Sequence, residues 1–450
     1  MTSLFVLSHL LASRKLSSRQ LVEDSIAAIR NPGGEGSRTF LAVHEHEAFT
    51  AADRIDAQRR NGAQLPVLAG IPVSIKDLFD EAGKTTLGGS TALIGSPPAT
   101  RDSTVVERLQ RAGAIIIGRT NMTEFAYSGV GINPHYGTPK NVFDRAAGRI
   151  PGGSSSGAAV SVTDDMAAAA IGTDTGGSVR IPAALNGLVG FKPTARRIPL
   201  DGVLPLSFSL DSVGPIAKSV ADCALLDHIL SADNDAIPTP AHLRDLRFAV
   251  PATRFQADLS PAVANAFAAA IARLSKAGAR VVELPMREFE LAADVNPRGA
   301  LASAEAWWWH RQWLGDRAGK YDPRVLMRIQ PGERISAAEY IDLLRHRDDF
   351  IRTIKAAAGS YDAMLMPTTP DTAPTIAEVN ANDEAYFRFN SRMLRNTSVV
   401  NSFNGCALSV PCHEPGTAPV GLMIAGTQNM DRRILAIGLA VETTLRAREL

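Results

Sequence analysis

The chain has 450 residues, and its 47 Lys and Arg against 46 Asp and Glu leave a formal net charge of +1. This near-neutral balance, without a run of Lys or Arg, argues against direct binding of nucleic acid. The three cysteines are too few for a disulfide framework and none lies in a CxxC pair, which indicates a reducing, cytoplasmic setting. No stretch approaches roughly 18 consecutive apolar residues, so we expect no membrane-spanning segment.

The beginning of the chain is predicted to form a pair of helices rather than a secretion signal. Leu4–Ala12 is apolar, but the basic residues Arg14 and Lys15 follow it, which reverses the order found in signals. Ser17 then opens a capping-box pattern, and an amphipathic helix is predicted through Ile29.

Downstream, apolar runs of strand length alternate with helical patterns. Strands are predicted at Leu68–Ile75, Ala114–Gly118, Leu246–Val250, Val281–Leu284, Ala363–Met366, Ala407–Val410 and Val420–Ile424. Helices are predicted at Thr104–Ala112, Pro261–Lys276 and Ala337–Ala358. Strands separated by helices indicate an α/β layer fold with a largely buried sheet.

The composition changes over Gly148–Ser178, which is rich in Gly, Ser and Ala and contains no aromatic residue. Small residues let the backbone approach a ligand closely and adopt unusual dihedral angles. A long run of them inside a compact domain is usually functional or disordered. Its Ala-rich middle, Gly157–Ile171, is predicted as a buried helix, which leaves one Gly/Ser loop at each end.

Two short motifs suggest other chemistry and are disfavoured by their context. Gly83-Lys84-Thr85 resembles part of a phosphate-binding loop, but Leu78 stands where that loop needs its first glycine. Gly153–Gly157 matches GxSxG, whose serine would be Ser155 in an α/β-hydrolase-like esterase. No apolar strand leads into it, and no histidine of the chain has a distinctive context as its partner.

A third arrangement combines Lys76 with the Gly152–Gly157 and Asp174–Ser178 loops. Lys76 ends an apolar run, so burial would lower its pKa and make a neutral, base-competent amine. The second loop offers consecutive backbone N–H groups beside a serine, as an oxyanion hole requires. A serine nucleophile with a lysine-derived base is a known alternative to the histidine triad. Two structural turns flanking a helix remain an alternative interpretation of the same spacing.

Several blocks of the sequence, in this order, resemble the amidase signature family of serine hydrolases. They are GIPVSIKDLFD (70–80), GRTNMTEFAYSG (118–129), PGGSSSGAAV (151–160), GTDTGGSVRIPAALNGLVGFKPT (172–194) and, more weakly, VGLMIAG (420–426). The resemblance implies one α/β domain over residues 1–450, with a large mixed, twisted β-sheet covered by helices on both faces. Its signature core would span about residues 65–220, and residues of about 235–345 would form a variable region that shapes substrate access.

Carried over residue by residue, the resemblance implies a Ser–cis-Ser–Lys triad of Ser178, Ser154 and Lys76. Ser178 would be the nucleophile, and Ser154, preceded by a cis peptide bond, would relay a proton to a neutral Lys76. The oxyanion hole would use the backbone N–H groups of Thr175, Gly176, Gly177 and Ser178. No metal and no cofactor is implied.

Neighbouring residues are expected to support or shape this site. Ser155 is assigned a secondary role in the relay, and Asp174 and Arg180 are expected to pair and hold the nucleophile loop. For the substrate pocket, Met122, Phe125 and Tyr127 follow a core strand, and Trp307 belongs to a cluster holding all four tryptophans of the chain. Clustered tryptophans can wall a pocket or simply pack a helix against the core.

The resulting functional hypothesis is a cytoplasmic amidase that hydrolyses a small or medium-sized carboxylic amide, with esters, ureas and carbamates as neighbouring substrates. One alternative is the A subunit of a tRNA-dependent amidotransferase, which has the same core motifs and acts with a partner. The esterase based on Ser155 is another. The sequence leaves open a homodimer and the need for a small partner subunit.

Overall fold

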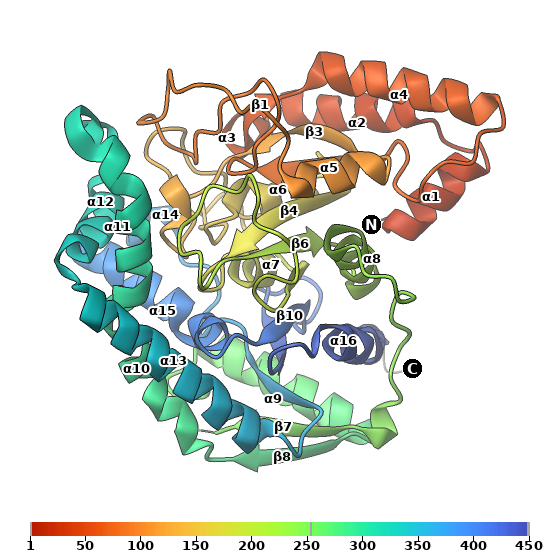
Figure 1. Cartoon of the computed structure of the whole chain (residues 1–450). Helices are drawn as coiled ribbons and strands as arrows, with labels where there is room; N and C mark the ends of the chain where they lie inside the picture. Colours follow the sequence, from red (N-terminus) through yellow and green to blue (C-terminus); the bar gives the residue numbers. More distant parts are fainter. Residues whose placement is uncertain (1, 253, 448–450) are drawn as a thin grey trace.

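A computed structural model describes residues 2–252 and 254–447, and in this part of the chain 11 strands form one sheet (Figure 1). The order across the sheet is β1-β3-β2-β4-β6-β5-β10-β11-β9-β7-β8. The strands are β1 (Phe40–Val43), β2 (Pro72–Lys76), β3 (Ile115–Thr120), β4 (Ala169–Asp174), β5 (Val189–Lys192), β6 (Ser212–Ala217), β7 (Arg247–Pro251), β8 (Arg280–Leu284), β9 (Ala363–Pro367), β10 (Cys406–Pro411) and β11 (Gly421–Gly426).

The sheet is mixed, as expected. β2 runs parallel to β3 and β4, and β7 runs parallel to β8 and β9. The other neighbouring pairs are antiparallel. β2, β4 and β6 are buried along their whole length, which explains why, apart from Lys76 and Asp174 at the strand ends, they consist of continuous small or apolar residues rather than an alternating pattern.

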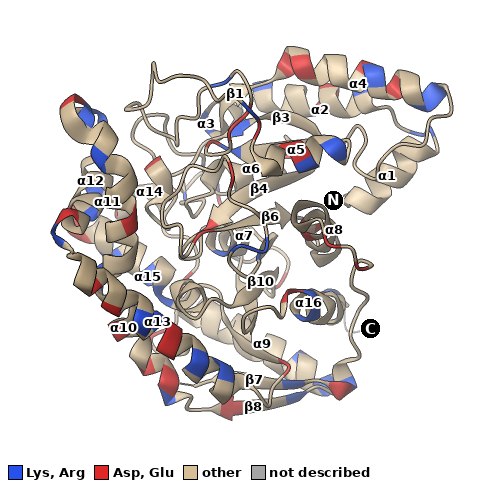
Figure 2. Cartoon of the chain, viewed as in Figure 1, with Lys and Arg blue, Asp and Glu red and all other residues tan. Residues whose placement is uncertain are grey.

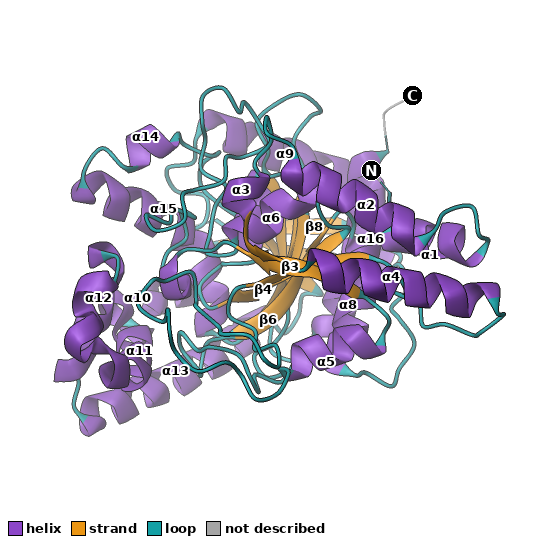
Figure 3. Ribbon diagram, turned by 90° about the horizontal axis from the view of Figure 1, so that it is seen from above, coloured by secondary structure: helices purple, strands orange, loops and turns teal. Residues whose placement is uncertain are grey.

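Helices enclose the sheet, which Figure 3 shows lying between them. The helices are α1 (Leu4–Ala12), α2 (Ser18–Arg30), α3 (Gly36–Thr39), α4 (Glu45–Arg60), α5 (Thr104–Arg111), α6 (Ser156–Thr163), α7 (Arg180–Leu185), α8 (Val220–Ser231), α9 (Pro261–Lys276), α10 (Ala292–Val295), α11 (Ala300–Leu314), α12 (Pro323–Ile329), α13 (Ala337–Ala358), α14 (Ile376–Val379), α15 (Asp383–Ser402) and α16 (Asp431–Arg446). Over one face, helix α5 packs against α8, α8 against α16, and α16 against α9. Helices α6, α7 and α15 cover the other face.

Charged residues of both signs are spread over the outer helices, whereas the interior strands carry few (Figure 2). Helix α11 packs against both α12 and α13 beside the sheet. Helices α11 and α12 lie within the region that we expected to be variable, and α13 begins in it. Among the described residues, no helix has the length and apolar character needed to cross a bilayer.

Most predicted elements are confirmed, with boundaries that shift by a few residues. Helices α9 and α13 have the predicted bounds, Pro261–Lys276 and Ala337–Ala358. The strand predicted at Leu68–Ile75 begins later, at Pro72, and extends to Lys76. Strands β1, β5 and β6 were not predicted, because two of them are only four residues long and β6 contains a glycine and a proline.

The buried helix predicted over Gly157–Ile171 is wrong in its second half. Helix α6 ends at Thr163, Asp165 has a left-handed backbone with φ of 55°, and the chain then forms strand β4. Strand β4 lies between β2 and β6, where both faces are covered. Alanine is a strong helix former, but here the tertiary pairing outweighs its propensity.

Helix α6 packs so closely that Gly157 has no room for a side chain. A Cβ atom there would lie 2.4 Å from the Thr39 carbonyl oxygen and 2.8 Å from both the N and the O of Asn121. We expect Gly157→Ala to lower the free energy of unfolding by about 1–3 kcal/mol through overpacking. Gly319→Ala is the control, because nothing lies within 4 Å of the added atom. Urea unfolding measures both variants, and equal stabilities would contradict the prediction.

Candidate active site

Lys76 stands at the end of strand β2, which lies between β3 and β4, and its side chain is fully buried. Its Nζ donates hydrogen bonds to Ser154 Oγ at 2.7 Å and to Thr173 Oγ1 at 3.0 Å. Burial lowers the pKa of Lys76 to about 7, although the nearby carboxylates of Asp211 and Asp174 act in the opposite direction. An amine with this pKa can take up and release a proton near neutral pH.

Ser154 lies in the loop before helix α6, and the Gly153–Ser154 peptide bond is cis. Backbone hydrogen bonds hold this loop on two sides. Thr123 N donates to the Ser154 carbonyl at 3.0 Å, and Ser155 N donates to the Ser178 carbonyl at 3.3 Å. The second of these bonds joins the two Gly/Ser loops that the sequence separates by helix α6 and strand β4.

The loop with Ser178 connects strand β4 to helix α7, and the carboxylate of Asp174 fixes its shape. This carboxylate accepts hydrogen bonds from the backbone N–H groups of Gly177 at 2.9 Å, Val179 at 3.1 Å and Arg180 at 3.3 Å. Gly177, which we expected to donate to an oxyanion, therefore has its N–H engaged within the protein. Thr175, Gly176 and Ser178 remain as the other expected donors.

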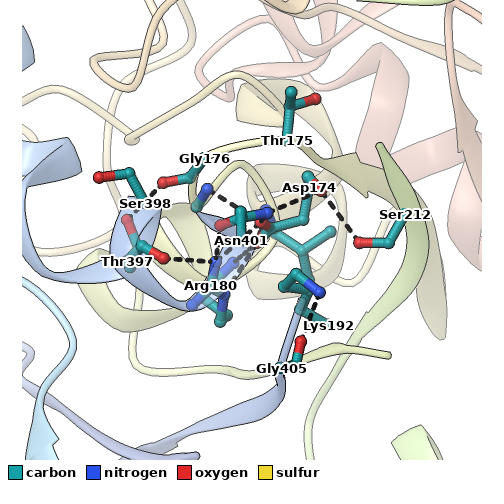
Figure 4. A network of polar contacts seen from close by, with 12 residues as sticks. Asp174, Thr175, Gly176, Arg180, Lys192, Ser212, Thr397, Ser398, Asn401 and Gly405 are labelled. Atoms are coloured by element: carbon teal, nitrogen blue, oxygen red, sulfur yellow. Dashed lines mark hydrogen bonds and ion pairs between the residues drawn. The ribbon is translucent and has the colours of Figure 1, made fainter. Parts of the chain in front are cut away.

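Asp174 and Arg180 form a fully buried ion pair, as expected (Figure 4). The guanidinium donates to both carboxylate oxygens, through Nε at 3.0 Å and Nη2 at 2.8 Å. Nη2 also donates to the Thr397 carbonyl at 3.1 Å and to Asn401 Oδ1 at 2.6 Å on helix α15. Burial opposes the ionisation of Asp174, but the charge and hydrogen bonds of Arg180 outweigh it and hold the pKa well below its usual range.

Helix α15 also contacts the loop directly, because Thr397 Oγ1 donates to the Gly176 carbonyl at 2.6 Å. Gly177 has φ of 137°, and a Cβ atom there would lie 2.1 Å from Thr397 Oγ1. Any other residue at position 177 would displace either the loop or the helix.

On the other side of the loop, the Thr175 hydroxyl donates to the buried carboxylate of Asp211. Asp211 also accepts from the backbone N–H groups of Leu206 and Ser207, each at 3.0 Å. Burial raises the pKa of Asp211 to about 6, although these hydrogen bonds favour the ionised form.

A cavity of about 470 Å³ opens onto this loop, and Thr175, Gly176 and Ser178 line it. Lys76 and Ser154 are fully buried behind the wall and are not among the lining residues. Ser178 is therefore the member of the expected triad that a ligand in the cavity can reach. Among the described residues, no three His, Cys, Asp or Glu side chains are grouped as a metal site would need.

Of the residues expected in the pocket, Tyr127 lines the cavity, whereas Met122, Phe125 and Trp307 do not. Met122 and Phe125 are fully buried in the core. Phe125 packs against Trp309, His310 and Tyr321, with its ring centroid 4.5 Å from that of His310. The tryptophan segment thus serves mainly to pack helix α11, which places Trp307 against the hydrophobic core.

Ser155 is fully buried, and its hydroxyl donates to the Thr173 carbonyl at 3.5 Å. Four further residues contact the site without having been predicted from the sequence: Thr173, Asp211, Thr397 and Asn401. Thr173 has one local signal, because it lies in the same GTDTGGS block as Ser178. The others come from distant segments, and only the fold brings them to the loop.

Comparisons with known proteins identify relatives of the chain. The chain matches the family described as Amidase over residues 35–435. It is 38% identical over 405 residues to the 2-amino-5-chloromuconic acid deaminase of Comamonas testosteroni, in an alignment that covers 88% of this chain and 86% of that protein. It is 33% identical over 481 residues to the A subunit of the glutamyl-tRNA(Gln) amidotransferase of Symbiobacterium thermophilum, in an alignment that covers 98% of this chain and 96% of that protein.

The fold of the chain is also similar to that of a solved structure. A crystal structure described as that of an amidase superposes with a TM-score of 0.89 at 30% identity, covering 98% of this chain and 99% of that one. The chain therefore belongs to the amidase signature family, and it is a hydrolase that acts on amide C–N bonds.

The burial of Lys76 makes stability depend on pH. Its pKa in the folded chain is about 7, below the ordinary value of 10.5, so between these values the unfolded chain binds more protons. The folded state therefore loses stability as the pH falls through this window. We expect the melting temperature of Lys76→Met, relative to the wild type, to rise as the pH is lowered from about 10 to about 7.

Thermal unfolding followed by circular dichroism measures this difference at several pH values. Lys355→Met is the matched control, because Lys355 is exposed on helix α13. The melting temperature of Lys355→Met should differ from that of the wild type by the same amount at every pH. A pH-independent difference in melting temperature for Lys76→Met would contradict the prediction.

Proposed function

We propose that the protein hydrolyses a small or medium-sized carboxylic amide through an ester intermediate on Ser178, with Ser154 and Lys76 as the proton relay. The observation that carries the proposal is the 2.7 Å hydrogen bond from Lys76 Nζ to Ser154 Oγ behind a loop whose Ser178 faces a cavity. The lowered pKa of Lys76 supports it, because an amine must be neutral to accept a proton.

In the acylation step, Ser178 Oγ attacks the amide carbonyl while its proton passes to Ser154, whose own proton passes to Lys76. The carbonyl carbon becomes tetrahedral and its oxygen gains the negative charge. The proton then returns through Ser154 to the leaving nitrogen, the C–N bond breaks, and ammonia or an amine departs. Water repeats the sequence on the ester and releases the carboxylic acid.

We assign the oxyanion hole to the backbone N–H groups of Thr175, Gly176 and Ser178, since that of Gly177 donates to Asp174. Preorganised donors of this kind stabilise the charge that develops in the transition state. Asp174 and Arg180 act as positioning residues, because they shape the loop without lining the cavity.

A second candidate is the A subunit of a tRNA-dependent amidotransferase, which would release ammonia from glutamine within a complex. The 33% identity to such a protein over 98% of this chain favours it. Hydrolysis of simple amides by the isolated chain distinguishes the two functions.

We also propose a cytoplasmic location. Among the described residues, Cys223, Cys406 and Cys412 are unpaired. Burial raises the pKa of Cys412 to about 12, so its thiol stays protonated and unreactive.

Labelling with a fluorophosphonate probe, followed by peptide mass spectrometry, tests the nucleophile. We expect one adduct, on Ser178, that is absent in Ser178→Ala. Labelling and amide hydrolysis should both slow by roughly 100-fold or more in Lys76→Ala, because the base is lost. Ser155→Ala is the control and should still be labelled at Ser178.

An adduct on Ser155 would overturn the assignment and favour the esterase mechanism. If Ser178 is labelled but the isolated chain hydrolyses no simple amide, the amidotransferase function becomes the better interpretation.

The pH dependence of kcat/KM tests the role of Lys76. Activity should rise with pH with a midpoint near 7, because only the neutral amine accepts a proton. In Asp211→Asn the midpoint should move to lower pH, because the Asp211 carboxylate raises the pKa of Lys76. Activity that falls as the pH rises through this range would contradict Lys76 as the base.

A further inference from the structure

Among the described residues, the charged side chains that line the cavity in front of Ser178 are all positive. Three arginines line it, Arg254, Arg298 and Arg328, and no described aspartate or glutamate does. The chain as a whole has nearly equal numbers of basic and acidic residues. The excess of positive charge is thus local to this cavity and to an adjoining hollow, and it is not a property of the protein surface in general. That hollow is lined by Arg254, Arg388, Arg392 and Arg395.

The three arginines come from separate parts of the chain. Arg254 follows strand β7, Arg298 lies in the short segment Pro297–Gly299, and Arg328 lies in helix α12. The fold brings all three to the cavity that Ser178 lines. Like-charged side chains around one hollow repel one another, so an anion bound between them would stabilise the arrangement.

Arg254 has hydrogen-bonding capacity that the protein does not use. Its Nε is buried, and it has no hydrogen-bond partner among the described residues. Burial alone lowers the pKa of Arg254, and no carboxylate in the described part of the chain offsets that effect. The adjoining hollow shares Arg254, Ser391, Leu394 and Ser398 with this cavity. There, by contrast, Arg392 is paired with both Asp258 and Asp371. An unpartnered donor of a charged group is costly to bury, and a carboxylate ligand would satisfy it.

Arg328 is held in place before any ligand arrives. Its Nη1 donates to the Tyr127 carbonyl, and its guanidinium lies 4.3 Å from the centroid of the Tyr127 ring. Tyr127 lines the cavity and its hydroxyl donates to the Arg328 carbonyl at 3.2 Å. A guanidinium fixed on an aromatic face keeps N–H groups in a planar fork that suits a carboxylate.

From these observations we infer that the substrate is an amide that carries a carboxylate at its other end, which Arg254 and Arg328 bind, with Arg298 at the exposed side. The inference rests on the proposed hydrolysis at Ser178 and specifies its substrate class as monoamides of dicarboxylic acids. A cavity of about 470 Å³ is of the size that encloses a small organic acid.

Matched pairs of amides test this inference. Each pair consists of an ω-carboxylated amide and the neutral amide with a methyl group in place of the carboxylate: malonamic acid with propanamide, succinamic acid with butanamide, glutaramic acid with pentanamide, and adipamic acid with hexanamide. At pH 7.5 we expect kcat/KM of the best carboxylated amide to exceed that of its neutral partner by roughly 10-fold or more, since hydrogen bonds to charged groups are the strong ones.

The variants Arg254→Gln and Arg328→Gln should reduce this ratio toward one, mainly by lowering kcat/KM of the carboxylated amide. Arg254→Lys keeps the charge but not the fork and should recover part of the preference. Arg388→Gln is the matched control, since Arg388 is exposed and lines the adjoining hollow but not this cavity. It removes one positive charge nearby and should leave the ratio unchanged.

A binding readout separates this inference from the proposed function. The carboxylated amides should protect Ser178 from the fluorophosphonate at lower concentrations than their neutral partners, and Arg254→Gln should abolish the difference. Normal labelling of each variant in the absence of amide shows that its site is intact. Equal protection by the two members of every pair, or a preference that survives both Gln variants, would overturn the carboxylate site. Absence of any labelling at Ser178 would instead overturn the proposed function.

Discussion

The buried ion pair between Asp174 and Arg180 is the interaction on which the site depends. Its partners join the end of strand β4, the beginning of helix α7 and the side of helix α15, and the same carboxylate fixes the backbone beside Ser178. Removing one partner of such a pair typically costs about 3–5 kcal/mol, because an uncompensated charge stays buried. The pair is tolerated in the core because Asn401 satisfies hydrogen-bonding groups of both residues.

In the proposed mechanism, cationic side chains serve opposite purposes on the two sides of the loop that carries Ser178. Behind it, the dry interior lowers the pKa of Lys76 and favours the amine without a charge. In front of it, guanidinium groups line the cavity, and their planar fork of N–H donors suits an anion. The proposed proton acceptor and the proposed anion-binding surface can therefore lie on opposite sides of Ser178 and keep distinct roles. The two purposes differ because a lysine amine loses its proton readily when it is buried, whereas a guanidinium offers a rigid fork of N–H donors.

The sequence was informative where local patterns decide structure. The long helices α9 and α13 and most buried strands were predicted to within a few residues, because their apolar periodicity is strong. It failed over Ala169–Asp174, where an Ala-rich segment forms a central strand. It also failed at Met122 and Phe125, whose apolar side chains suit a pocket wall and a core equally well, and the structure places both in the core.

The sequence by itself determined the family and the short-range parts of the site, because Ser154, Ser178 and Asp174 lie in compact blocks whose order is distinctive. Only the tertiary structure decided which groups surround them. Asn401 reaches Asp174 across 227 positions of sequence, and Thr397 reaches Gly176 across 221. Such contacts arise from strand order and helix packing, which no local pattern encodes. The same holds for the arginines, since their residue type is visible in the sequence but their convergence on one cavity is not.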